Sequence, residues 1–290
     1  MTADYQSILQ QQASAPLATR NDENHYLIPL PSYGVITVTG EEAANFLQNL
    51  LTNDVKQLEQ QASQITAMCN PKGRLLALVL PQSQCAFLAQ RLQMFKLRSK
   101  VEIADCSETL QVCGLQGNDP STSAIPLPSQ SRALLIASTD QMTSDLEDLM
   151  SKGWQLAAEA SWFITEIESG IPVIFPSSRE LFTAQQLNLD LIGGVSFRKG
   201  CYPGQEVVAR LHYLGEPKRR LFQAIAKTDI LPEIGETIVD KEKAVIGHVV
   251  NAIHGDENQL FLQLSLKLDG ANQDLYLSDG TAIESVHAYV

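Results

Sequence analysis

The clearest chemical signal in the chain is residues 199–206, which read Lys-Gly-Cys-Tyr-Pro-Gly-Gln-Glu and directly follow Arg198. Two glycines and a proline are costly inside a helix or strand, so the segment predicts a tight loop that presents the thiol of Cys201. Positive charge close to a thiol favours the thiolate, which is the reactive form. A buried, unreactive side chain is the alternative, because a single cysteine commonly packs as a small hydrophobe.

A second pattern combines an aromatic side chain with carboxylates in a helix expected at about 160–169. Trp162 and Glu166 are four residues apart and share one helix face, whereas Glu168 lies round the helix, near its end. This combination suits a pterin, since an aromatic ring stacks on the heterocycle and a carboxylate accepts hydrogen bonds from its N–H groups. A core tryptophan with a solvated glutamate is the alternative interpretation.

Lys218, Arg219 and Arg220 form the densest basic run of an acidic chain. Arginine pairs bidentately with carboxylates, so the run is a candidate clamp for an acidic ligand. A solvated strand entry is the alternative, as for most runs of charge.

His212 follows the cysteine segment closely in the chain. A Cys–His pair would activate the thiol of Cys201, but only geometry can establish such a pair, and surface or core packing of His212 is the alternative. Glu206 has a simpler interpretation, because a glutamate in a first helical turn complements the helix dipole.

Composition excludes several classes of protein. The 290 residues carry 33 acidic and 21 basic side chains, a net charge of -12, so we expect no broad nucleic-acid-binding face and no direct nucleic-acid binding. The five cysteines form no Cys-x-x-Cys pair, which predicts no metal site. An odd cysteine count with a polar N-terminus, and no apolar run near about 18 residues, predicts a cytoplasmic protein without a membrane span.

Residue patterns predict a mixture of helices and strands. A turn composition at 70–73 predicts a β-hairpin between 65–69 and 74–80. Thr39 and Glu42 have the spacing of a capping box before a helix that contains Phe46. Gly170 and Pro172 are expected to end the helix at about 160–169. The remaining expected helices are 86–97 and 141–150, and the expected strands are 33–39, 101–104, 110–115, 133–137, 222–226, 245–250, 259–264 and 282–286.

Further segments accompany the cysteine segment: Phe-Leu-Gln at 46–48, Leu-Thr-Asn-Asp-Val at 51–55, Cys-Asn-Pro-Lys-Gly-Arg at 69–74 and Glu-Ser-Gly-Ile-Pro at 168–172. With residues 194–210 and 218–220, they resemble the YgfZ family of folate-binding proteins, which are relatives of the glycine-cleavage T-protein, an aminomethyltransferase. The resemblance covers most of the chain from about Tyr33 onward. The family motif is highly specific and consists here of Lys199, Gly200, Cys201, Tyr202, Gly204, Gln205 and Glu206.

The resemblance implies an α+β fold: a T-protein-like folate-binding module around a central cleft, followed by a C-terminal β-barrel. We expect an N-terminal arm over 1–26, the folate-binding module over 27–216 with a subdomain at about 110–157, and the barrel over 217–290. Tetrahydrofolate or a derivative is the implied cofactor.

The resemblance also implies roles for particular residues. Cys201 is the candidate catalytic thiolate. Glu168 matches the glutamate that binds the pterin in T-protein relatives, and aromatic residues at the positions of Trp162 and Tyr33 are implicated in folate binding. Tyr33 stands where the compared relatives have tryptophan. For the glutamate tail of folate, Arg219 is the favoured arginine and Arg220 the alternative.

One departure from the T-protein bears on activity. There, an acidic residue shortly after the glycine of the hairpin is linked to aminomethyl transfer, whereas residues 74–78 here read Arg-Leu-Leu-Ala-Leu. An alkyl side chain cannot handle a proton as a carboxylate does. We therefore expect glycine-cleavage aminomethyltransferase activity to be absent.

Three functions remain open from the sequence. The resemblance favours a tetrahydrofolate-binding protein that supports assembly or repair of iron–sulfur enzymes, including those that modify tRNA, with iron–sulfur client or assembly proteins as partners. A folate-dependent aminomethyltransferase or demethylase is the first alternative. A non-catalytic, folate-responsive adaptor is the second.

Overall fold

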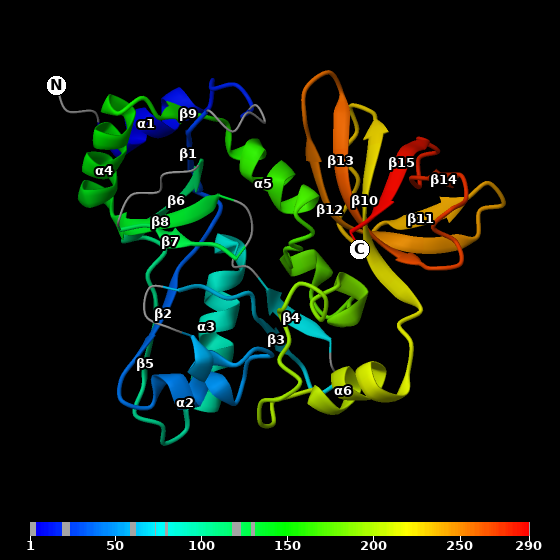
Figure 1. Ribbon diagram of the computed structural model, residues 1–290, viewed down its shortest axis with the longest axis horizontal. Helices are drawn as coiled ribbons and strands as arrows, with labels where there is room; N and C mark the ends of the chain where they lie inside the picture. Colours follow the sequence, from blue (N-terminus) through cyan, green and yellow to red (C-terminus); the bar gives the residue numbers. More distant parts are fainter. Residues whose placement is uncertain are drawn as a thin grey trace. The chain divides into compact units, whose positions relative to one another are not determined.

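The computed structural model describes residues 4–18, 24–58, 62–72, 74–78, 81–117, 123–128 and 131–289. The chain divides into two compact units that interleave along the sequence. The first unit comprises 1–43, 57–64 and 80–163, and the second comprises 44–56, 65–79 and 164–290. Figure 1 shows the helices and strands of both units.

The first unit is built on a five-stranded sheet with strand order β7-β8-β6-β1-β9. Its strands are β1 (Tyr26–Pro29), β6 (Leu110–Gln116), β7 (Ile125–Pro126), β8 (Arg132–Ser138) and β9 (Gln155–Leu156). The order of β6, β1 and β9 brings segments that are far apart in sequence side by side, with β1 antiparallel to β6 and parallel to β9.

The two faces of this sheet bury different side chains, because successive residues of a strand point to opposite sides. Leu27 packs with the helices α1 (Tyr5–Gln12) and α4 (Thr139–Ser151), which lie together beside the sheet in Figure 1. Ile28, the next residue, packs with Trp162 of α5 (Glu159–Glu168) on the other face. The sheet therefore fixes the position of Trp162.

A smaller ribbon completes the first unit. Strands β2 (Ile36–Thr39) and β5 (Glu102–Asp105) pair antiparallel, and α3 (Gln82–Lys96) contacts β5. The predicted capping box before α2 (Ala43–Gln48) is replaced by another contact, because a carboxylate oxygen of Glu42 accepts a hydrogen bond from the backbone N–H of Lys100 at 2.6 Å.

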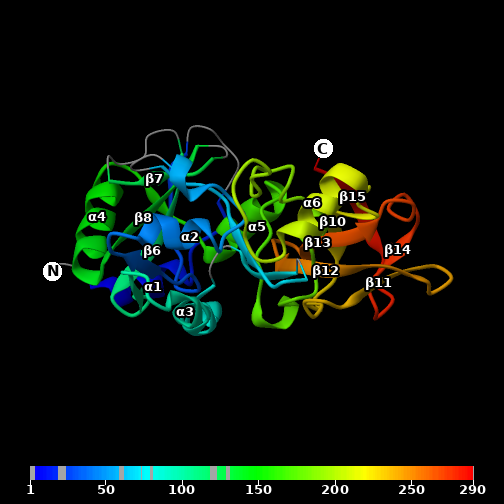
Figure 2. The ribbon, with the colours of Figure 1, turned by 90° about the horizontal axis from the view of Figure 1, so that it is seen from below.

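The second unit contains a six-stranded antiparallel sheet with strand order β14-β11-β12-β13-β10-β15, whose strands are also visible in Figure 2. The edge strand β14 makes a further bridge from Tyr276 to Ala282, next to the other edge strand, so the sheet curls into a nearly closed barrel. The predicted C-terminal barrel is therefore confirmed. The strands are β10 (Arg219–Lys227), β11 (Thr237–Asp240), β12 (Val245–His254), β13 (Gln259–Lys267), β14 (Leu275–Tyr276) and β15 (Ile283–Ala288).

Two apolar clusters stabilise the second unit. Phe222, Leu262 and Ile238 belong to the cluster formed by the barrel strands. Leu221, one residue before Phe222, points the other way and packs with Val208 of α6 (Gln205–Leu214). Strand alternation in β10 therefore joins the barrel to the segment that carries the cysteine motif.

The predicted hairpin is present as β3 (Ala67–Cys69) and β4 (Leu75–Leu78). The side-chain oxygen of Asn70 accepts hydrogen bonds from the backbone N–H groups of Lys72 and Arg74, at 2.9 and 3.0 Å, and so closes the turn. The remaining short 3-10 helices are η1 (Val55–Gln57), η2 (Pro176–Ser178) and η3 (Gln185–Leu187).

Candidate functional site

The cysteine motif forms a loop that leads into a helix. Gly204 adopts a φ of +81°, which favours glycine, and α6 begins at the next residue. Tyr202 is 5% exposed, whereas Cys201 is an exposed free thiol. The predicted loop is thus confirmed for 199–204, but Gln205 and Glu206 belong to the first turn of α6.

Lys199 is buried, with 7% of its surface exposed. Its amine donates hydrogen bonds to three backbone carbonyls, those of Gln48 at 2.6 Å, Leu51 at 2.5 Å and Asn53 at 2.9 Å. Burial lowers the pKa of Lys199 to about 8, while the nearby Asp54 carboxylate acts in the opposite direction. The amine therefore remains an ammonium at neutral pH, and its three N–H donors match three carbonyl acceptors.

Thr52 and Asn53 connect the same turn to the chain before the motif. The Thr52 hydroxyl donates to the carbonyl of Gly194 at 2.7 Å, and the Thr52 carbonyl accepts from the N–H of Ser196 at 3.0 Å. The Asn53 amide donates to the carbonyl of Gly193 at 2.8 Å. These bonds join two segments about 140 residues apart, both of which belong to the family resemblance.

Tyr33 and Trp162, the two aromatic candidates, are in contact in the first unit. The Trp162 indole N–H donates to the Tyr33 hydroxyl oxygen at 3.3 Å. Trp162 is 1% exposed, with the Arg132 guanidinium 4.8 Å from its ring and Gly114 packed against the indole. Tyr33 is only partly buried and also packs at 5.8 Å, between ring centroids, against Phe163.

Arg132 was not singled out by the sequence, and it is 4% exposed. It is the first residue of β8 and precedes a run of apolar residues, and a charged residue at the start of a strand is expected to be exposed to solvent. Its guanidinium instead lies over an aromatic ring, an attractive arrangement for a cation. Only the three-dimensional contact with Trp162 identifies it.

Glu166 and Glu168 lie near the end of α5. Glu166 is 4% exposed, as expected for a residue on the face of Trp162, and Glu168 is partly exposed. Gly170, with a φ of +70°, follows the helix and confirms the predicted C-cap. Tyr289 packs against Gly170, and its hydroxyl donates to the carbonyl of Ile167.

Burial raises the pKa of the Tyr289 hydroxyl, and the charge of Glu168 adds to this effect. The Tyr289 hydroxyl therefore stays protonated and able to donate over the physiological range. This contact fixes the end of α5 beside Glu168.

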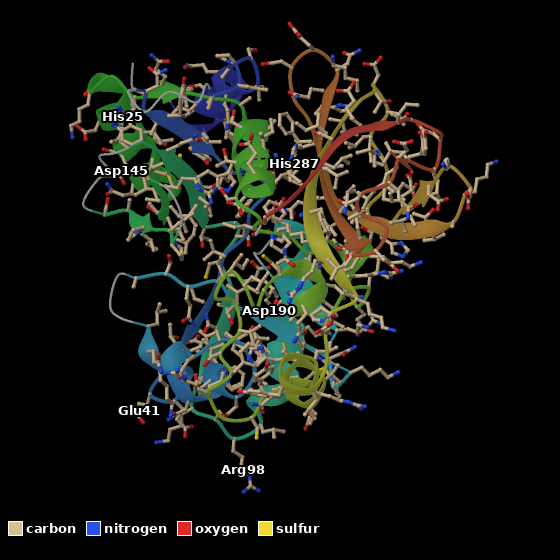
Figure 3. All side chains as sticks on the ribbon, turned by 45° about the vertical axis from the view of Figure 1, so that its right-hand side comes forward. His25, Glu41, Arg98, Asp145, Asp190 and His287 are labelled. Carbon is tan, nitrogen blue, oxygen red and sulfur yellow. The ribbon has the colours of Figure 1, made fainter. Side chains whose placement is uncertain are left out.

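The basic run divides between two roles. Arg220 binds both carboxylate oxygens of Asp190, at 2.7 and 3.0 Å, and also donates to the carbonyl of Gln185. Asp190 is labelled in Figure 3. Arg219 points to the opposite side of β10, because neighbours on a strand alternate. Within the described ranges no ion pair involves Arg219, whereas Arg220 is engaged by Asp190.

His212 stacks on Phe197, with ring centroids 3.6 Å apart and planes 12° from parallel. Tyr213 completes this cluster, with its ring centroid 4.7 Å from that of His212 and the two planes at 78°. His212 therefore contacts aromatic rings, and the structure gives no hydrogen bond between it and Cys201 among the residues described.

The candidates thus fall into two groups. Tyr33 and Trp162 lie in the first unit and touch each other. Glu168, Cys201 and Arg219 belong to the second unit.

The parts of the chain that the structure describes hold no cluster of three or more His, Cys, Asp or Glu side chains that could bind a metal ion. No helix there has the length and apolarity needed to span a bilayer.

Comparison with a solved structure defines the fold class. The crystal structure of glycine cleavage system aminomethyltransferase T from Bartonella henselae superposes with a TM-score of 0.69 over 98% of this chain and 89% of that protein, at 13% sequence identity. The chain therefore has the T-protein fold, as the resemblance implied.

Sequence comparison adds curated relatives, although no protein-family model matches the chain. The tRNA-modifying protein YgfZ of Hamiltonella defensa subsp. Acyrthosiphon pisum (strain 5AT) is 28% identical over 91% of this chain and 89% of its own length. The protein of the same name from Escherichia coli O17:K52:H18 (strain UMN026 / ExPEC) is 28% identical over 84% and 86%. The resemblance to YgfZ proteins is confirmed.

Proposed function

We propose that this protein binds tetrahydrofolate or a derivative and supports the assembly or repair of iron–sulfur enzymes, including enzymes that modify tRNA. The name of its relatives, tRNA-modifying protein YgfZ, supports the link to tRNA. The T-protein fold supports a folate ligand. The observation that carries the proposal is an exposed thiol, Cys201, on a loop whose neighbouring side chains are firmly held.

The candidate residues have side chains of the types that a folate ligand requires. Tyr33 offers a partly exposed ring for the pterin, and Trp162, itself covered by Gly114 and Arg132, holds the Tyr33 hydroxyl. A folate supplies a one-carbon carrier when bound. The Glu168 carboxylate accepts hydrogen bonds from pterin N–H groups, and Arg219 pairs with the carboxylates of the glutamate tail.

Cys201 supplies one soft ligand or nucleophile. Stable iron–sulfur clusters commonly require four protein ligands, so a single thiolate makes a shared or transient contact with a cluster held by a client protein. Clients and assembly proteins are therefore the partners that we propose. With free thiols throughout and an acidic surface charge, we assign the protein to a reducing cytoplasm and no direct nucleic-acid binding.

The aminomethyltransferase alternative draws its support from the fold of its structural neighbour. The segment after the hairpin turn lacks the acid that the T-protein resemblance links to that reaction, so we propose that the chain lacks this activity. Formation of methylenetetrahydrofolate from an amine donor by the purified protein would reverse this assignment.

The decisive test compares Cys201→Ala with Cys106→Ser in cells that lack the native protein. We expect Cys201→Ala to lose support of an iron–sulfur tRNA-modifying enzyme while calorimetric titration still detects tetrahydrofolate binding. Cys106→Ser, which changes the other cysteine that is not buried, retains both. Full support by Cys201→Ala would instead indicate a folate-responsive adaptor, and absence of tetrahydrofolate binding in the unmodified protein would remove the folate part of the proposal.

A further inference from the structure

The motif lysine has a different environment from the one expected near a reactive thiol. Its amine is directed at the carbonyls of Gln48, Leu51 and Asn53, all within 2.9 Å, and it lies 5.3 Å from the centre of the Tyr202 ring. An ammonium has three N–H groups, and each finds one of these carbonyls. Lys199 is therefore a structural connector between two distant segments.

The carbonyls that Lys199 binds come from the end of α2 and the turn that follows it. The last carbonyls of a helix lack partners within the helix and carry partial negative charge, so a cation there is stabilising. The same turn is also bound by Thr52 and Asn53 to residues 193–196. Lys199 is the contact of this set that lies closest in sequence to Cys201.

The other side of the loop is fixed as well. Tyr202 is 5% exposed, and Gly204 adopts the left-handed conformation that starts α6. By contrast, Gly200 has no atom within 4 Å of where a Cβ would lie, and Cys201 is exposed. Two exposed residues, 200 and 201, thus lie between a buried Lys199 and a buried Tyr202.

We propose that Lys199 is a positioning residue for Cys201: its ammonium binds the turn at 48–53 and thereby holds the loop that presents the thiol. This inference rests on the proposed function of Cys201. Lys199 fixes the geometry of the loop. The position of the Cys201 thiol therefore depends on the three hydrogen bonds that Lys199 donates to backbone carbonyls.

The first test measures hydrogen exchange in the full-length protein. Ser196 N–H bonds to Thr52 and Leu51 N–H bonds to Leu47, so these two amides report on the two connected segments. In Lys199→Met we expect both to exchange about tenfold faster or more, because all three charge-assisted hydrogen bonds of the ammonium are lost. Lys241→Met removes an exposed lysine of the barrel and leaves both rates unchanged.

The second test measures the alkylation rate of Cys201 at fixed pH, read by mass spectrometry on the peptide that contains it. We expect the rate in the native protein to differ from the rate in urea-unfolded chain, and Lys199→Met to move it toward the unfolded rate. If Lys199→Met does not fold, Lys199→Gln, which keeps two N–H donors for three carbonyls, replaces it and shifts the rate in the same direction.

Two results would overturn the inference. One is a native alkylation rate that already equals the unfolded rate, and the other is unchanged exchange at Ser196 and Leu51 in a folded Lys199 variant. If Cys201→Ala loses client support while Lys199 variants behave as the native protein, the proposed function stands and this inference fails. If Cys201→Ala retains client support, the proposed function itself fails, whatever Lys199 does to the loop.

Discussion

The indole N–H of Trp162 donates a hydrogen bond to the hydroxyl oxygen of Tyr33 at 3.3 Å, across 129 positions of sequence. The two rings differ in exposure, since Trp162 is 1% exposed and Tyr33 is partly exposed. A ligand that stacks on this pair therefore reaches Tyr33 first. In the proposed folate site, Trp162 acts through Tyr33 by fixing the direction of its hydroxyl.

This relationship predicts that the hydroxyl and the ring of Tyr33 have separate roles, one in stability and the other in ligand binding. Tyr33→Phe keeps the ring but removes the acceptor of the Trp162 N–H, so we expect it to cost about 1 kcal/mol of stability and to change tetrahydrofolate affinity little. Tyr33→Ala removes the stacking surface, which is worth roughly 1–3 kcal/mol for a nucleic-acid base on an aromatic ring, and weakens binding about tenfold or more. Thermal unfolding and calorimetric titration measure the two effects.

Tyr213→Ala is the matched control, because Tyr213 is a tyrosine with 65% of its surface exposed at the end of α6. It is expected to bind tetrahydrofolate as tightly as the unmodified protein. Equal affinity for Tyr33→Ala and Tyr213→Ala would place the pterin elsewhere.

Gly114 makes room for the Trp162 ring and predicts a second effect. A Cβ added there would lie 2.3 and 2.4 Å from two ring carbons of Trp162, too close for any side chain. We expect Gly114→Ala to lower the unfolding free energy by about 1–3 kcal/mol, the usual cost of overpacking a core, and to weaken tetrahydrofolate binding by displacing the indole. Urea titration followed by tryptophan fluorescence measures the stability.

Gly215→Ala serves as its comparison. Gly215 has an extended φ of -142°, and its added Cβ would have only ordinary contacts of 3.6 Å or more. The Gly215→Ala protein is expected to be as stable as the unmodified protein. A Gly114→Ala protein that is equally stable would show that the indole can shift freely.

Much of the fold followed from local patterns. The hairpin around Asn70 was predicted because its turn has a distinctive composition, and Gly170 correctly marked the end of α5. Strands β7, β9 and β14 were missed because each has only two residues, and β1 was missed because all four of its residues are buried, so none of them shows an alternation. Strand β11 was missed as well. Helix α6 was indicated only by Glu206 in its first turn, because the glycines and the proline at 200–204 favour a loop.

The candidate site was less predictable for a different physical reason. Residue types identified Lys199 and Arg220 as basic, but the direction of a long side chain depends on partners distant in sequence. Lys199 turns to carbonyls about 150 positions away, and Arg220 turns to Asp190. Neither contact has a signature in spacing or periodicity, so the basic setting expected for Cys201 had to be revised.

Because Arg219 and Arg220 have different surroundings, we expect substitution of one to change ligand affinity and substitution of the other to change stability. The side chain of Asp190 is 7% exposed and is paired with Arg220, so removing the guanidinium leaves a buried charge without its partner. We expect Arg220→Ala to cost about 3 kcal/mol of stability. Arg219→Ala, on the other side of β10, is expected to keep its stability and to lose affinity for the glutamate tail of folate.

The measurement is a comparison of two ligands on two variants. Tetrahydrofolate and its polyglutamylated form should differ less in affinity for Arg219→Ala than for the unmodified protein, because the added carboxylates lose a partner. A loss of polyglutamate preference in a stably folded Arg220→Lys protein, with the preference intact in Arg219→Ala, would assign the clamp to Arg220.

Lys199 predicts a pH dependence with a definite sign. Burial lowers its pKa from 10.5 to about 8, so between these values the unfolded chain binds a proton that the folded protein has released. Stability rises with pH wherever the unfolded state binds more protons. The unfolding free energy of the native protein should therefore rise relative to Lys199→Met between about pH 8 and 10.5, by at most about 3 kcal/mol.

The difference between the two proteins is the quantity to measure, because other groups act in the opposite direction. Burial raises the pKa of the Cys69 and Cys113 thiols from 9.0 to about 12, so these thiols remain protonated in the folded protein while the unfolded chain loses their protons. Both lower stability as pH rises from about 9, and both are present in the native and Lys199→Met proteins, so their contributions cancel in the difference. Urea unfolding at half-unit steps from pH 7 to 10.5 resolves the slope. A difference that stays flat over this interval would mean that the ammonium is as stable in its buried site as in water, and a difference that falls would mean that it is more stable there than in water.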